Sequence, residues 1–325
     1  MLIGCAICLS LAGCGGANSS HSHDNTIVGE VRVYKGDYPI QVVCTTGQIA
    51  DAVRQVGGKH IQVTALMGPG VDPHLYRALP KDINALKAAD LIFFNGMHLE
   101  GRMADVLVGM ARGRPTFAVT EKLQADGDPR LREPPDFEGH YDPHVWHDVK
   151  LWSDCVRYVA EQLAAFDPSN ADSYRQSTDA YVAELAKLHA ETLEQIKTIP
   201  KSRRVMVTAH DAFGYFGLAY GIDVYGLKGI STDDEVSLGR TEEIVKMLVK
   251  RKIPAVFVES AVAPRIVEAL IEPCKDQGHD VEIGGELYAD ALGPVGSDAT
   301  TYIGMISANV RTVVNALRVT PEATN

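Results

Sequence analysis

The sequence predicts an α/β protein in which two lobes with parallel sheets are joined by one long, rigid helix. The chain has 325 residues, which is more than a single hydrophobic core usually holds, so we expect two domains. In both halves short β-rich runs alternate with helical patterns, and this order is typical of βαβ units with parallel strands. Between the halves lies a helical pattern that is longer than any other in the chain.

The first half alternates between strands and helices. Strands are predicted over residues 40–45, 60–66, 91–95 and 115–119. Helices are predicted between them, over 48–56, 81–89 and 99–111. The first of these helices stops at Gly57 and Gly58, because glycine favours helix ends over helix interiors. Residues 126–139 are rich in proline, glycine and charged side chains, so we expect a loop there.

The second half repeats this pattern. Strands are predicted over 204–208, 223–227, 255–259 and 281–283, and helices over 241–251, 264–275 and 302–317. The last helix has apolar residues at a spacing of three to four, which places them on one face: Ile303, Ile306, Val310, Val313, Val314 and Leu317. We therefore expect two Rossmann-like lobes, over residues 38–166 and 201–325.

Residues 167–200 are predicted to form the helix that links the lobes. Asp167 supplies a capping side chain, and Pro168 follows at the first helical position. The pattern continues to Ile199 without an interior glycine and stops before a proline. At ~1.5 Å per residue such a helix is about 45 Å long, so it would act as a stiff spine. The alternative is two ordinary helices with a break near Ala190.

The N-terminus has the features of an export signal followed by a lipid anchor. Residues 1–12 are apolar or small, and this run is shorter than the roughly 20 residues that a membrane-spanning helix needs. Its end, Leu-Ala-Gly followed by Cys14, resembles a bacterial lipobox. We expect residues 1–13 to be a signal peptide, Cys14 to carry a lipid that holds the protein on a membrane, and 14–37 to be a flexible tether.

A frayed apolar N-terminus with a chance cysteine is the alternative to this interpretation. No lysine or arginine precedes the apolar run, so the true start codon stays open. Cys44, Cys155 and Cys274 lie in apolar stretches of the remaining chain. These stretches predict buried thiols, and the odd number of cysteines implies no complete disulfide framework.

The charge of the chain narrows its possible partners. The formal net charge is −11, which argues against nucleic acid, because binding phosphates requires a basic surface. An acidic protein is suited to handling cations, but a net charge does not locate a site.

Four segments place metal-binding side chains in turns near predicted strands and helices. They are 70–76 (Gly-Val-Asp-Pro-His-Leu-Tyr), 142–148 (Asp-Pro-His-Val-Trp-His-Asp), 208–213 (Thr-Ala-His-Asp-Ala-Phe) and 287–293 (Leu-Tyr-Ala-Asp-Ala-Leu-Gly). Ligands of α/β proteins bind beyond the carboxyl ends of strands. The candidate metal ligands, two from each lobe, are therefore His74, His144, His210 and Asp290. Three imidazoles and one carboxylate suit Zn²⁺, Mn²⁺ or Fe²⁺, and four protein ligands complete a tetrahedral Zn²⁺ shell.

With these segments, the chain resembles the zinc/manganese solute-binding proteins of bacterial ABC importers from about residue 40 to 317. The resemblance also rests on residues 89–92 (Ala-Asp-Leu-Ile), 229–232 (Gly-Ile-Ser-Thr) and 257–260 (Phe-Val-Glu-Ser). It implies two α/β lobes joined by a rigid helix, with one metal ion bound between them by the same four residues. It further implies an extracytoplasmic protein that delivers the ion to a membrane permease driven by an ATPase, and we expect a monomer.

Two departures from the family pattern leave the identity of the metal open. Many zinc-specific members carry a long loop rich in histidine and acidic residues in the first lobe. In this chain the loop over residues 126–139 is short and includes no histidine. Many manganese-specific members have glutamate at the third ligand position, where this chain has His210. The Irving–Williams order predicts that the isolated site binds Zn²⁺ more tightly than Mn²⁺. Glu259, at the end of a predicted strand, is a candidate to orient a ligating histidine.

Two other functions share some of these features. A metal-dependent hydrolase would need an open coordination position and a general base, for which Asp211 is a candidate. The sequence has no His-Glu-x-x-His motif, and four protein ligands leave little room for an activated water, so we expect no enzyme. A lipid-anchored adhesin is compatible with the tether, but no repeat indicates it. His147 is a weaker candidate ligand, three residues after His144.

Overall fold

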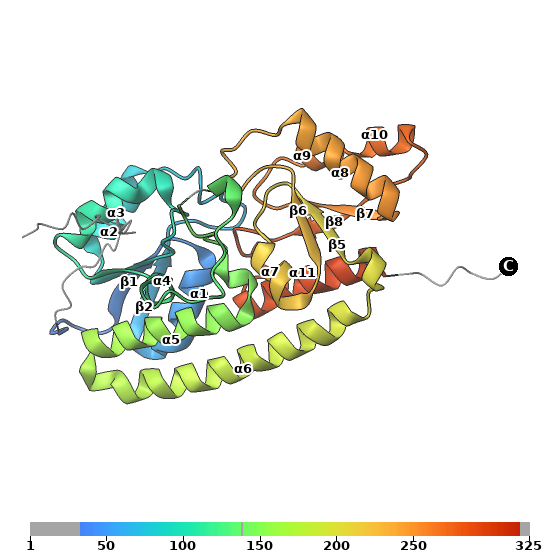
Figure 1. The fold of residues 1–325 in the computed structure, drawn as a ribbon. Helices are drawn as coiled ribbons and strands as arrows, with labels where there is room; N and C mark the ends of the chain where they lie inside the picture. Colours follow the sequence, from blue (N-terminus) through green and yellow to red (C-terminus); the bar gives the residue numbers. More distant parts are fainter. Residues whose placement is uncertain (1–32, 138, 319–325) are drawn as a thin grey trace, which may run out of the picture.

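The computed structural model describes residues 33–137 and 139–318, which form two α/β lobes placed above a pair of long helices (Figure 1). The first lobe is built on a four-stranded parallel sheet, and the second on two pairs of parallel strands. The predicted fold class is therefore confirmed. The predicted signal peptide, Cys14 and most of the tether lie outside the described residues. No helix in the described part of the chain is long and apolar enough to cross a membrane.

The sheet of the first lobe has apolar side chains on both faces, as parallel sheets between helices require. Its order is β2 (Ile61–Ala65), β1 (Ile40–Cys44), β3 (Leu91–Phe94) and β4 (Thr116–Ala118). Alternate residues of β3 point to opposite sides, because side chains in a strand repeat every two residues. Ile92 and Phe94 pack with residues of α2 (Pro80–Ala88) and α3 (Ala104–Ala111), whereas Leu91 and Phe93 join the main core with α1 (Gly47–Gly57).

Two features of the first lobe differ from the prediction. The helix expected over 99–111 is shorter, because a 3-10 turn (Gly101–Met103) precedes α3. The loop before it contains three successive residues with positive φ, Gly96, Met97 and His98, and the buried Glu100 carboxylate accepts from the backbone N–H groups of Asn95 and Gly96. This carboxylate stabilises the tight loop, so the helix begins later.

No range was predicted for one long helix, α5 (Val149–Phe166), which follows the 142–148 segment. Its sequence carries the helical signals: the Asp148 side chain caps the N-terminus by accepting from the backbone N–H of Lys150, and buried residues recur at a spacing of three to four. A short helix, α4 (Glu121–Ala125), also follows β4.

In the second lobe, β5 (Val205–Thr208) pairs with β6 (Asp223–Gly226), and β7 (Ala255–Glu259) pairs with β8 (Glu282–Leu287). The short helix α7 (Gly214–Tyr220) follows β5 and was not predicted. The strand expected over 281–283 extends to Leu287, because a bulge opposite Phe257 accommodates Gly284 and Gly285.

The remaining helices of this lobe are α8 (Leu238–Arg251), α9 (Arg265–Glu268), α10 (Ile271–Asp276) and α11 (Tyr302–Leu317). The prediction of one continuous helix over 264–275 was wrong, because α9 and α10 are separate helices. Pro273 lies in α10 and has no N–H to bond to the carbonyl four residues earlier, which favours a break there.

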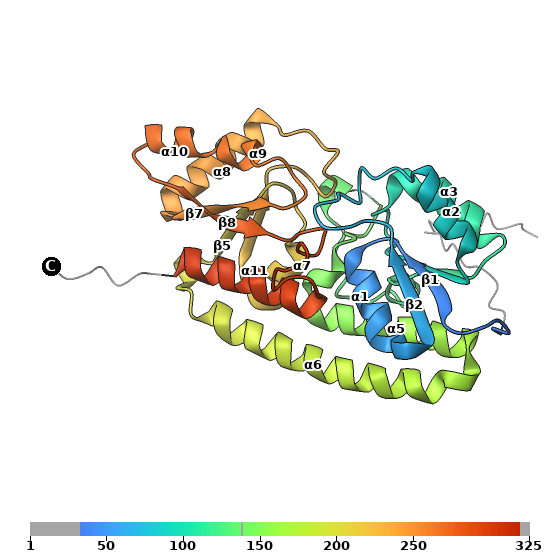
Figure 2. The same ribbon diagram turned by 180° about the vertical axis from the view of Figure 1, so that it is seen from behind.

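The predicted spine is α6 (Ala171–Lys197), a single helix of 27 residues that follows a 3-10 turn (Pro168–Asn170). At ~1.5 Å per residue it is about 40 Å long. The alternative break near Ala190 is wrong. From behind, α6 runs under both lobes (Figure 2), in contact with α1 of the first lobe and α11 of the second.

The base of the two lobes is tied together where α1, α6 and α11 meet. The buried Asp51 carboxylate of α1 accepts from the backbone N–H of Tyr302 at 2.9 Å and from the hydroxyl of Tyr181 at 3.4 Å. The ring of Tyr302 also stacks on Trp152 of α5, with centroids 5.3 Å apart. These contacts fix the lobes on the side of the spine. Cys44, Cys155 and Cys274 are buried and unpaired, as predicted.

Candidate metal centre

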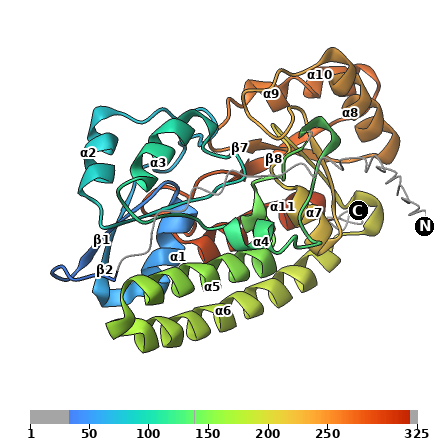
Figure 3. The ribbon, with the colours of Figure 1, turned by 60° about the vertical axis from the view of Figure 1, so that its left-hand side comes forward.

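The four predicted ligands meet in one buried cluster between the lobes. His74 follows β2 and His144 precedes α5, whereas His210 follows β5 and Asp290 follows β8. One ligand atom from each residue can be chosen so that all four lie within 4.8 Å of one another, and all four residues are buried. Figure 3 shows the two lobes facing each other above α5 and α6.

Several distances between these atoms are close to the edge length of a small tetrahedron. The Nε2 atoms of His74 and His144 are 3.2 Å apart. Asp290 Oδ1 lies 3.5 Å from His144 Nε2, while Asp290 Oδ2 lies 3.3 Å from His210 Nε2 and 3.8 Å from His74 Nε2. In a tetrahedral Zn²⁺ shell with bonds of about 2.0–2.1 Å, neighbouring ligand atoms are about 3.3–3.4 Å apart. The cluster therefore has the dimensions of a metal site.

The polar atoms at the centre of this cluster lack other partners. Both carboxylate oxygens of Asp290 and Nε2 of His210 are buried and have no hydrogen bond within the described chain. Leaving a buried polar atom unpaired is costly, and an unpaired buried charge costs still more. A cation held by these atoms would satisfy them together, so the donor set fits a metal ion.

Carboxylates behind two of the histidines fix the orientation of their rings. Asp142 Oδ1 lies 2.7 Å from Nδ1 of His144, and Glu259 Oε2 lies 2.6 Å from Nδ1 of His210. A proton on Nδ1 in each ring leaves Nε2 with a free lone pair that faces the other ligands. Glu259 was predicted as such a partner, whereas Asp142 was not.

The role of Asp142 could have been found from the repeated Asp-Pro-His tripeptide. In both copies the aspartate accepts a hydrogen bond from the histidine backbone N–H at 2.9 Å, from His74 to Asp72 and from His144 to Asp142. Such a bond from an aspartate to a residue two positions later is a common turn for this side chain. The tripeptide is therefore a local device that sets the direction of the histidine.

The pKa values of the three histidines shift in opposite directions, because burial lowers each of them and the nearby carboxylates raise them. Burial lowers the pKa of His144, but Asp142 and Asp290 outweigh it and raise this pKa to about 9. The pKa of His210 is likewise raised well above its usual range, because Glu259 and Asp290 outweigh burial. Burial lowers the pKa of His74 to about 3, so its ring is neutral. A metal ion would therefore displace protons from two of the three rings.

The other candidate residues lie outside the cluster. His147 is buried, but its Nε2 lies 3.1 Å from the carbonyl oxygen of Ala289 and its ring packs on Phe213. Asp211, the candidate general base, forms an ion pair with Arg132 at 3.3 Å. Neither residue joins the four ligands.

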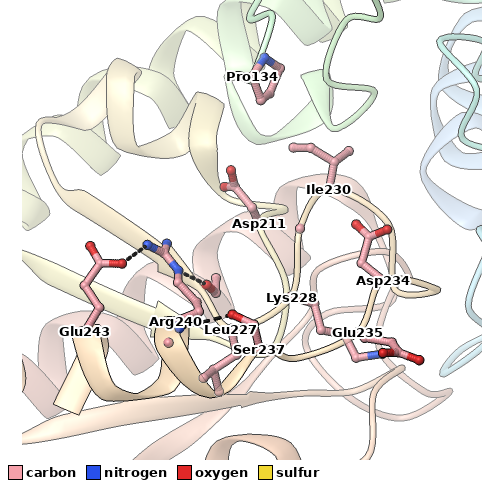
Figure 4. A pocket seen from close by; sticks show the side chains of 13 residues that line it. Pro134, Asp211, Leu227, Lys228, Ile230, Asp234, Glu235, Ser237, Arg240 and Glu243 are labelled. Carbon is pink, nitrogen blue, oxygen red and sulfur yellow. Dashed lines mark hydrogen bonds and ion pairs between the residues drawn. The ribbon is translucent and has the colours of Figure 1, made fainter. Parts of the chain in front are cut away.

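A separate open groove of about 620 Å³ lies beside the site in the second lobe (Figure 4). Most of its lining comes from the segment around Leu227, Asp234 and Arg240, and none of the four candidate ligands lines it. Its lining includes Asp211, the neighbour of His210. The groove is thus a surface feature next to the cluster.

Comparisons with known proteins agree with this geometry. The family model described as zinc-uptake complex component A, periplasmic (ZnuA), matches residues 42–316. The chain is 44% identical over 283 residues to the manganese-binding lipoprotein MntA of Bacillus subtilis (strain 168), covering 87% of this chain and 91% of that protein. It is 44% identical over 276 residues to the zinc-binding protein TroA of Treponema pallidum (strain Nichols), covering 85% and 88%.

The fold has a solved counterpart as well. The structure of the periplasmic zinc binding protein TroA from Treponema pallidum superposes with a TM-score of 0.82 at 42% identity, covering 86% of this chain and 99% of that one. The family model spans most of the chain, and two relatives with these coverages are both 44% identical to it. This chain therefore belongs to the family of the zinc-uptake complex component A, periplasmic.

Proposed function

We propose that this protein is the extracytoplasmic metal-binding subunit of an ABC importer. It captures one Zn²⁺ or Mn²⁺ ion between its lobes and delivers it to a membrane permease driven by an ATPase. The observation that carries this proposal is the buried cluster of three imidazoles and one carboxylate, whose ligand atoms all lie within 4.8 Å of one another. The ligands are His74, His144, His210 and Asp290, and Asp142 and Glu259 orient two of the rings.

The donor set suits both ions that appear in the names of the relatives, which are manganese for MntA and zinc for TroA. Three imidazoles favour zinc, and the Irving–Williams order makes the isolated site bind Zn²⁺ more tightly than Mn²⁺. The ion that is carried in the cell depends also on which metal is available there. Fe²⁺ is a further ion that imidazole and carboxylate accommodate.

We propose further that the chain is a lipid-anchored monomer that acts without catalysis. Residues 1–13 would be a signal peptide, Cys14 the lipidated residue and 14–37 the tether, followed by lobes over 38–166 and 201–325 joined by 167–200. The lipoprotein name of the Bacillus subtilis relative supports the anchor. The comparisons give no support to a hydrolase or an adhesin.

Metal binding is tested by titrating the metal-free protein with Zn²⁺ and Mn²⁺ in a calorimeter. We expect one ion per chain and tighter binding of zinc. Asp290→Ala should weaken binding by more than about 100-fold, since removing even an outer partner of a ligand costs 10–100-fold. The matched control is Asp280→Ala, at an exposed position. Equal affinity in both variants would exclude Asp290 as a ligand.

The transported ion is tested by measuring the metal content of protein purified from its source cells. Zinc or manganese at one ion per chain supports the proposal, and a preparation without either ion contradicts it. The anchor is tested separately with Cys14→Ser, which should move the protein from the membrane fraction to the soluble fraction. A variant that stays with the membrane would exclude this anchor.

A further inference from the structure

Arg132 lies in the first-lobe loop before His144, and its guanidinium reaches across to the second lobe. It forms ion pairs with Asp142 and, at 3.3 Å between Nη2 and Oδ2, with Asp211. Asp142 belongs to the same lobe as His144, whereas Asp211 directly follows His210. One side chain thus contacts the two turns that carry a ligand of each lobe.

On the first-lobe side, Arg132 is fixed to the turn of His144. Its Nη1 pairs with Oδ2 of Asp142, whose other oxygen lies 2.7 Å from Nδ1 of His144. The Arg132 carbonyl also accepts from the backbone N–H of Asp142 at 2.9 Å. Because the Asp142 carboxylate is completely buried, removing the arginine would leave a buried charge without this partner.

On the second-lobe side, Arg132 lies against α7. The Tyr215 hydroxyl accepts from the backbone N–H of Arg132 at 3.1 Å and donates to the carbonyl of Asp142 at 2.9 Å. At Gly214 an added Cβ would lie only 1.3 Å from Nη1 of Arg132. Any side chain at this position would therefore displace the guanidinium.

The ion pair with Asp211 lies at the edge of the open groove. Asp211 lines one wall, and Pro134, two residues after Arg132, faces it from the first lobe (Figure 4). In the same groove, a Cβ on Gly226 would meet the backbone of His210 and Asp211 within 2.6 Å, so this wall lies directly against the ligand turn. The pair thus joins the lobes on the groove side, whereas Asp51 and Tyr302 join them on the spine side.

We propose that Arg132 is a positioning residue that latches the two lobes across the metal site and slows release of the bound ion. The inference rests on the proposed function. Release requires ligands from opposite lobes to separate, and the lobes cannot separate on the groove side without breaking the pair between Arg132 and Asp211. Through Asp142 the same guanidinium also keeps His144 oriented toward the ion.

The release rate is measured by mixing Zn²⁺-loaded full-length protein with excess chelator in a stopped-flow instrument. Arg132→Gln should raise the release rate by up to about 10–100-fold, the range for disturbing the partner of a ligand, because Asp142 behind His144 loses the cation it pairs with. Asp211→Asn leaves the ion pair between Arg132 and Asp142 intact. It should raise the release rate by about 2–5-fold, the effect of losing one partly exposed ion pair. In the double variant, Asp211→Asn should add nothing, because its partner is already gone.

Two further variants separate a latch from a general loss of structure. Gly214→Ala keeps the arginine but displaces its guanidinium, so it should also speed release. Arg102→Gln removes a different ion pair, from Arg102 to Asp233 at 2.7 Å, which touches no carboxylate bonded to a proposed ligand. Its release rate should stay within about twofold of the wild type, as expected for an exposed surface pair. Thermal unfolding of the metal-free variants reports any loss of folding.

The outcomes distinguish this inference from the proposed function. A wild-type protein that binds no zinc would overturn the proposed function and the latch with it. Normal zinc binding with an unchanged release rate in Arg132→Gln and Gly214→Ala would overturn the latch alone. An equal acceleration by Arg102→Gln would show that any ion pair between the lobes suffices, which also contradicts a specific role of Arg132.

Discussion

Glu259→Gln tests how strongly the site depends on the partner behind His210. The buried carboxylate accepts from Nδ1 of His210 at 2.6 Å and from its backbone N–H at 2.9 Å. Glutamine has one acceptor oxygen, so it cannot satisfy both groups, and its NH₂ group would face an N–H donor. The ring then loses its partner at Nδ1 or moves the proton to Nε2, where the metal would bind.

The expected loss is set by the fact that this contact is short, charged and completely buried. Outer carboxylates of ligating histidines change metal affinity by about 10–100-fold, which corresponds to about 1.4–2.8 kcal/mol. We expect the upper end of this range for Glu259→Gln, measured by competition with a chelator of known affinity. Glu286→Gln, an exposed position on β8, is the matched control. An affinity for Glu259→Gln equal to that of the control would refute the reasoning.

Three other predictions follow from the site and the spine. Metal affinity should fall as pH drops from about 9, because His144 has a pKa of about 9, that of His210 is also raised, and binding displaces their protons. Calorimetry in buffers of different ionisation enthalpy counts these protons, and an affinity independent of pH would contradict the displacement. Solution scattering should show no large compaction on metal binding, because α6 runs under both lobes; a marked fall in the radius of gyration would argue against a stiff spine. Leu185→Ala, fully buried in α6, should lower the free energy of unfolding by about 2–5 kcal/mol in urea titrations, while the exposed Lys187→Ala should leave it nearly unchanged.

The sequence was most informative where metal-binding residues lie in turns next to strands or helices that can themselves be predicted. The ligand motifs lie in turns close to strands and helices, so residues such as His210 could be placed at one edge of the sheet before their contacts were known. The spine was predictable because helical periodicity is strongest in long segments without glycine. Glu259 could be chosen because it ends a strand, and its contact with His210 is present.

Contacts between the lobes could not be predicted in this way. Arg132 and Asp211 are far apart in sequence, and only the folded arrangement brings them together at 3.3 Å. The same applies to the pKa of His144. An ordinary imidazole predicts loss of binding below about pH 6.5, whereas the buried carboxylates shift this pKa to about 9. The sequence alone does not reveal which charged side chains the fold brings together around a buried histidine.

Some local elements were missed although their signals were present. Helix α5 has a capping aspartate and a regular apolar face, but no range was predicted for it. The break between α9 and α10 follows from Pro273, which was read as part of one helix. Proline within a helical pattern is therefore better treated as a boundary.

The central claim is that His74, His144, His210 and Asp290 hold one metal ion between the lobes. Anomalous X-ray diffraction from crystals of the Zn²⁺-loaded protein tests it most directly. We predict a single strong peak about 2.0–2.1 Å from the three Nε2 atoms and from a carboxylate oxygen of Asp290. A strongest peak anywhere else, or a cleft without a peak in zinc-saturated protein, would contradict the account.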